Sequence, residues 1–139
     1  MAPSVAAFLY SDGIRQEIQN QQPSLSIINP RVALTPMFIP GQHSFAVTFG
    51  VMEIETGHTI QYIFKSPSKK QLIDTGQITV PALNEDQLKL PQDMRSAMLG
   101  LDFKNVVFEE NGTYVSEVLY DGESLSTFPI KVLGQNTNA

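Results

Sequence analysis

Large apolar residues alternate with small or polar ones along much of the chain. The clearest case is residues 43–55, where every second position from Phe45 to Phe49 is large and apolar. Residues 59–65 repeat the pattern with Ile60, Tyr62 and Phe64. A period of two places one face of a strand toward a core and the other toward solvent. Both segments are therefore predicted to be half-buried β-strands, with a bulge at Gly50.

Two hairpin signals follow near the C-terminus. Asn111-Gly112 and Asp121-Gly122 each supply two adjacent residues that tolerate positive φ, as tight primed turns require. The flanking residues favour strands. The pattern predicts an antiparallel three-stranded meander from residue 99 to residue 132, with Phe128, Ile130 and Val132 facing inward.

Shorter apolar runs predict further strands over residues 5–10, 24–28, 32–38 and 71–80. Ser11-Asp12-Gly13 is expected to end the first strand, and the polar segment 14–22 to form a loop or a helical turn. Asn84 and Gln87 have the spacing of a helix capping box, so one or two short helical turns are expected over 84–98.

The sum is about eight short strands separated by turn signals. This pattern predicts an all-β protein, a two-sheet antiparallel β-sandwich. The length of 139 residues fits one domain, assigned to residues 1–133, with a mobile polar tail over 134–139.

Composition narrows the functional classes. The net charge is −5, and residues 71–139 carry four basic and ten acidic side chains, which argues against nucleic acid as a partner. The chain has no cysteine, so thiolate chemistry and disulfides are excluded. Because no signal peptide or spanning segment is visible, a cytoplasmic location without membrane contact is expected, with a phage or mobile-element context left open.

Several short motifs occur along the chain in an order that is similar to that of a known protein family. Ala7-Phe8-Leu9 precedes Asp12 and Arg15-Gln16-Glu17, Ser24 to Ile28 follows, and the closing part runs through Asn105 to Phe108, Gly112-Thr113-Tyr114, Asp121-Gly122 and Phe128 to Val132. This order resembles a family of uncharacterised bacterial single-domain β-sandwich proteins with immunoglobulin-like and C2-like features. The resemblance implies the fold and no activity, because the family has no established function.

Catalytic chemistry has little support in these residues. The two histidines, His43 and His58, are expected to flank a hairpin around Thr56-Gly57 as solvent-exposed turn residues, well offset from each other, and no nucleophile elbow accompanies them. The four tyrosines are expected in the core. We therefore predict no catalytic residue and no cofactor.

A cation site is the remaining chemical candidate. Glu109 and Glu110 are expected at the opposite end of one strand from Asp121, about 30 Å away, so they cannot share an ion. Whether acidic loops around Asp86, Asp93 and Asp102 bind a cation is left open, and no metal ligand is assigned. Asn111-Gly112-Thr113 matches a glycosylation acceptor that the predicted turn explains, and Lys69-Lys70 is an isolated basic pair.

By elimination, the sequence favours a non-catalytic binding or assembly module that acts through protein–protein contacts, including self-association. Alternatives are a small-ligand or carbohydrate-binding module and a phage or mobile-element structural component. Pro36, Pro40 and Pro129 are expected to protect sheet edges against uncontrolled pairing.

Overall fold

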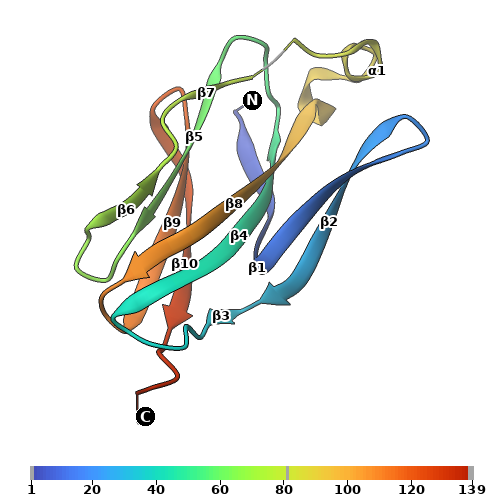
Figure 1. Ribbon diagram of the computed structural model, residues 1–139. Helices are drawn as coiled ribbons and strands as arrows, with labels where there is room; N and C mark the ends of the chain where they lie inside the picture. The colour runs from blue at the N-terminus through green and yellow to red at the C-terminus, as the bar shows by residue number, and fades with distance from the viewer. Residues whose placement is uncertain (1, 81, 138–139) are drawn as a thin grey trace.

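The computed structural model describes residues 2–80 and 82–137 and shows two β-sheets packed face to face (Figure 1). One sheet has the order β2-β1-β4-β8, and the other has the order β3-β10-β9-β5-β6, with β7 also paired to β5. The strands are β1 (Ser4–Gln19), β2 (Gln22–Arg31), β3 (Ala33–Leu34), β4 (Gly41–Met52), β5 (Thr59–Lys65), β6 (Gln71–Asp74), β7 (Ile78–Thr79), β8 (Ser96–Phe108), β9 (Gly112–Tyr120) and β10 (Glu123–Val132). The predicted all-β sandwich is confirmed, with ten strands in place of about eight.

The core lies between the sheets and is rich in aromatic residues. The alternating apolar residues of β4 and β5 point into it, and all four tyrosines are buried as predicted. The prediction that β4 is only half-buried is wrong, because Ala46 and Thr48 on its outer face are also buried. Thr48 lies opposite Gly100 of β8, and the side chains of Ile14 and Leu25 lie over Gly100 from outside.

The bulge predicted at Gly50 lies instead in the neighbouring strand. Gly50 pairs regularly with Ala6, and one step further Ala7 and Phe8 of β1 together face Phe49. Ala7 has a φ of 56°, so the extra residue is accommodated in the left-handed region.

The predicted C-terminal meander is wrong in one connection. β9 and β10 form a hairpin in which Asp121 and Gly122 have φ of 52° and 82°, as expected for a primed turn. β8 belongs to the other sheet, so the chain crosses between the sheets at residues 109–111. The Tyr114 hydroxyl donates to the Glu110 carbonyl at 2.6 Å and fixes this crossing, much like the tyrosine corner of immunoglobulin domains. The predicted primed turn at Asn111-Gly112 is wrong, because only Gly112 of the two has a positive φ, 136°, and β8 and β9 form no hairpin.

The first strand is much longer than predicted. β1 continues through Ser11-Asp12-Gly13, and the polar segment that follows is strand rather than loop or helical turn. The chain reverses at Asn20 and Gln21, whose φ values are 50° and 61°, and returns as β2. The resulting hairpin extends away from the rest of the sandwich (Figure 1). Polar residues predominate because much of this hairpin lies in water.

The remaining elements are shorter than expected. The segment 32–38 contains only β3, which pairs in parallel with the end of β10, and 71–80 is divided into β6 and β7. Helix α1 (Glu85–Leu88) is capped as predicted, because Asn84 Oδ1 accepts from the Gln87 amide at 2.8 Å. The reciprocal half of the capping box is missing: Gln87 Oε1 instead accepts from the amide of Ser96. A 3-10 helix, Gln92–Met94, follows Pro91.

The C-terminal segment runs alongside residues 35–39. The Gln135 amide donates to the Pro36 carbonyl at 2.8 Å, and the Ile39 amide donates to Asn136 Oδ1 at 3.1 Å. Asn111, predicted as a turn residue, holds this segment through its side chain, because Asn111 Oδ1 accepts from the amide of Gly134. Residues 138 and 139 of the predicted tail lie outside the described residues. The helices in the described part of the chain are too short and polar to cross a membrane.

Candidate functional site

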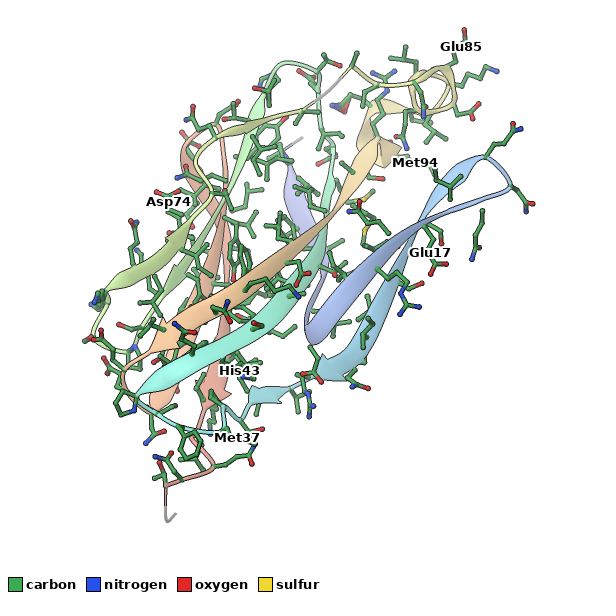
Figure 2. The ribbon with its side chains drawn as sticks, viewed as in Figure 1. Glu17, Met37, His43, Asp74, Glu85 and Met94 are labelled. Atoms are coloured by element: carbon green, nitrogen blue, oxygen red, sulfur yellow. The ribbon has the colours of Figure 1, made fainter. Side chains whose placement is uncertain are left out.

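The two histidines lie at different ends of the sandwich, and the predicted hairpin between them is wrong because β4 and β5 belong to different sheets. His43 lies near the start of β4 opposite Val106 (Figure 2). Its ring packs edge-on against Phe108, and burial lowers the pKa of the imidazole. His43 is therefore predominantly neutral at pH 7 and partly shielded from solvent.

His58 lies between acidic groups next to the β9–β10 turn. Its Nδ1 contacts the Asp121 carboxylate, its Nε2 lies 3.4 Å from Glu55, and its ring stacks on Tyr120. Hydrogen bonding to Asp121 raises the pKa of His58, and the same contact lowers the pKa of Asp121. Both ring nitrogens face carboxylates, so this arrangement connects the residue before β5 to the β9–β10 turn.

The acidic residues considered for a cation do not converge. Asp86 lies in α1, Asp93 in the 3-10 helix, and Asp102 in the middle of β8, where it pairs with Lys104 at 3.3 Å. Glu109 and Glu110 lie before β9 and Asp121 after it, at opposite ends of that strand as predicted. Among residues 2–80 and 82–137, no three His, Asp or Glu side chains form a potential metal site.

A polar cavity of about 270 Å³ lies where the chain passes from one sheet to the other, lined by Asp12, Arg31, Thr35, His43 and Gln135 among others. Arg31 donates two hydrogen bonds to Asp12, at 2.8 and 2.7 Å. This contact lowers the pKa of Asp12. The two charges satisfy each other, so the cavity presents little net charge to a ligand.

An apolar groove of about 280 Å³ separates the β1–β2 hairpin from β8. Gln16, Ser24, Leu25, Met98 and Gly100 line it. Because Gly100 has no side chain, Leu25 can approach the sheet: a Cβ at position 100 would lie 3.1 Å from a Leu25 methyl. Met98 is 60% exposed on the floor, so the hairpin covers this face incompletely.

The most distinctive feature of the surface is the edge strand β2. It forms the outer border of the sandwich in Figure 1 and is paired on one side only, with β1, among the described residues. Residues 22–30 carry no charge, and Ile27 and Ile28 are 36% and 39% exposed. Natural sheets usually protect edges of this length with charges, bulges or short strands, because free amide and carbonyl groups recruit further strands.

The other sheet edges in the described part of the chain have such protection. β3 has two residues and β6 has four, and β10, which β3 borders only at residues 131–132, carries Glu123, a bulge beside Leu125 and Pro129 along its open part. β8 is long, but its first amide donates to Gln87 of α1, and a bulge places Lys104 and Asn105 opposite Ser44 in its second half. Within residues 22–30, β2 is thus a long edge with neither a charge nor a bulge against β1; its prolines, Pro23 and Pro30, lie near the two ends of this run, and Arg31 follows it.

The register identifies the free backbone groups of β2. Gln19 and Gln22 flank a two-residue turn and therefore form a hydrogen-bonded pair. Hydrogen-bonded and non-hydrogen-bonded pairs alternate along an antiparallel ladder. The amide and carbonyl groups of Leu25 and Ile27 accordingly point away from β1, toward the open side.

Sequence reasoning missed this site. It assigned only 24–28 to a strand and took 14–22 as loop or helical turn, so the pairing partner of β2 was not recognised. Two signals for this hairpin were present in the sequence. Ile14 and Ile18 recur among polar residues, and Asn20-Gln21 can form a tight turn, although this pair is a weaker turn signal than Asn-Gly.

Comparison with known proteins places the chain in a family. The profile described as "Family of unknown function (DUF6941)" matches residues 9–133. The chain belongs to this family. None of the curated proteins matches the chain.

Three solved structures are similar to parts or all of this DUF6941 member. Part of an alkylpurine DNA glycosylase of Pseudomonas fluorescens, solved bound to DNA with an abasic-site analogue, is similar with a TM-score of 0.54 and 7% identity, over 94% of this chain and 30% of that one. An immunoglobulin-like protein of Pseudomonas aeruginosa gives 0.46 and 11%, over 95% and 97% of the two chains. A β-glucosidase of Listeria innocua gives 0.44 and 10%, over 99% and 16%. At this identity the likeness to the glycosylase shows the fold alone, and the chain spans under a third of that enzyme.

Proposed function

We propose that this protein is a non-catalytic β-sandwich that binds a protein partner by strand addition to the free edge of β2. The observation that supports this proposal is the uncharged run 22–30 on an edge strand, in a sandwich whose other described edges are short, bulged or charged. An added strand would satisfy the free backbone groups of Leu25 and Ile27, the interaction used in β-augmentation.

The chemistry of β2 specifies the kind of segment that fits. Leu25 and Ile27 share one face of the β1–β2 ladder with Ile14, and Leu25 lines the groove beside β8; Ser24 and Ser26 alternate with them along the strand. A strand paired to β2 would place alternate side chains beside Leu25 and Ile27, close to the exposed Met98. The preferred partner is therefore an extended segment with apolar residues at every second position.

Site-specific photo-crosslinking tests this function. A benzoyl-phenylalanine at position 28, on the exposed part of β2, is expected to form a defined protein adduct in a lysate of the native host. The same group at position 71, on the short edge strand β6, is the matched control and is expected to form none.

A backbone substitution in β2 tests whether the adduct depends on the free edge of this strand. Ile27→Pro removes an amide that points away from β1, so the hairpin ladder is retained while the outer edge loses a donor. Ile27→Val keeps the amide and the shape. Loss of the adduct in the proline variant and retention in the valine variant support the proposal, and equal labelling in both, or at position 71, contradicts it.

A further inference from the structure

We infer that the segment that occupies the β2 edge is β2 of a second copy of this chain, paired antiparallel about a twofold axis at Ser26. This inference rests on the proposed function and names its partner. It follows from the sequence of β2 itself, which meets the requirement that the free edge sets for a partner.

The strand is self-complementary in length. When a twofold axis relates two antiparallel strands, the sequence numbers of any two residues that face each other add up to the same value. With Ser26 on the axis, the uncharged run 22–30 lies opposite the same run of its copy, with Gln22 opposite Pro30 at each end. No charged side chain of either copy is then placed within the paired run.

The strand is also self-complementary in its hydrogen bonds. The same register sets Leu25 of one copy opposite Ile27 of the other, and both have backbone groups that face the open side. Each such pair exchanges two backbone hydrogen bonds, and the axis generates both pairs. Shifting one strand by an odd number of residues from this register would place Leu25 and Ile27 opposite residues such as Ser24 or Ser26. The backbone groups of those serines already face β1.

Side chains fit the same register. Leu25 and Ile27 of the two copies form apolar cross-strand pairs on the groove side, and Ser26 faces Ser26 on the other side, where Ser24 meets the partly exposed Ile28. Cross-strand apolar pairs add to the stability of such an interface.

The ends of β2 limit the pairing to a closed pair. Pro23 has no amide to donate, and Asn29 has a φ of 51°, which turns the strand out of regular extension. The regular ladder is therefore centred on 25–27, and a symmetric pair uses up the free edge of both copies. Because this ladder is short, we expect a reversible, concentration-dependent dimer.

The chain offers a sharp test because it contains no cysteine. Ser26→Cys places two thiols opposite each other in a non-hydrogen-bonded pair, within disulfide reach. Ser24→Cys is the matched control on the same strand and face, with its copy about 13 Å away along the strand. With oxidised glutathione, the position-26 variant is expected to form a disulfide-linked dimer at least about tenfold faster than the position-24 variant, and adding Ile27→Pro should remove the difference.

Sedimentation of the unmodified protein completes the test. Reversible dimerisation that is lost in Ile27→Pro and kept in Ile27→Val is expected. A dimer with no preference for position 26 overturns this register. A monomer at every concentration, with equal oxidation of both cysteine variants, overturns the second copy as partner. The proposed function then still stands if the position-28 adduct contains another protein and depends on the Ile27 amide, and it fails separately if no such adduct forms.

Discussion

Tyr10 of β1 and Ser116 of β9 join the two sheets through their side-chain oxygens, which lie 2.6 Å apart in the core. The Tyr10 hydroxyl donates to the Phe128 carbonyl at 2.8 Å, so the Ser116 hydroxyl donates to Tyr10. Ser116 in turn accepts from the Tyr62 hydroxyl, also at 2.6 Å. Each hydroxyl in this chain has a partner, and burial raises the pKa of both tyrosines, so they stay protonated.

We expect Ser116→Ala to destabilise the protein by about 1–3 kcal/mol, because the buried Tyr62 hydroxyl loses its acceptor. Denaturant unfolding measures this loss, and Ser124→Ala, at an exposed serine on β10, should change stability by less than about 0.5 kcal/mol. If Tyr62→Phe is added, the combined loss should be smaller than the sum of the two. An additive double variant would show that the two hydroxyls do not interact.

Thr48, unlike Ser116, is a buried residue whose hydroxyl forms no hydrogen bond among the described residues. It is 1% exposed. Thr48→Val replaces that hydroxyl with a methyl of similar shape, so we expect a gain of about 1 kcal/mol in unfolding free energy. The control is Thr127→Val on the exposed side of β10, where little change is expected. A loss of stability at position 48 would show that its hydroxyl is satisfied.

The β9–β10 turn depends on a glycine conformation. Gly122 has a φ of 82°, and a Cβ there would contact nothing within 4 Å, so Gly122→Ala should cost about 1 kcal/mol through the backbone alone. Gly13→Ala is the control, since a Cβ at position 13 would make an ordinary contact of 3.9 Å with Ile28. Similar melting temperatures for the two variants would contradict the primed-turn assignment.

The contact between His58 and Asp121 makes stability depend on pH. The pKa of His58 is raised above 6.5, so its contribution is full below pH 6.5 and is lost as pH rises through the native pKa. The pKa of Asp121 is lowered from 3.8, so its contribution is present above pH 3.8 and is lost as pH falls through the native pKa. The melting-temperature difference between wild type and His58→Gln should therefore be largest near about pH 5–6 and shrink by about pH 9. A difference that grows with pH would contradict the contact.

Local sequence signals predicted what is decided locally. The alternation through Phe45 and Phe64, the primed turn at Asp121 and the cap at Asn84 are each set by a few neighbouring residues, and the structure confirms them. The assignment of strands to sheets is not local. β8 and β9 are joined by three residues yet belong to different sheets, because Tyr114 fixes a crossing and not a hairpin.

The candidate site was hidden for a related reason. Ile14 and Ile18 lie among polar residues, since much of the β1–β2 hairpin lies outside the sandwich, and hydrophobic content alone did not predict a strand there. The open edge of β2 is a property of its place in the sheet. Only the order β2-β1-β4-β8 shows that the uncharged run 22–30 has one side free.

Amide hydrogen exchange at β2 tests the central claim most directly. The amides of Ser24 and Ser26 face β1, and those of Leu25 and Ile27 face the open side. In concentrated protein we predict that the Leu25 and Ile27 amides are protected like their neighbours, and that this protection is lost on dilution while Ser24 and Ser26 keep theirs. Leu25 and Ile27 amides that exchange freely at every concentration would contradict pairing between two copies through β2.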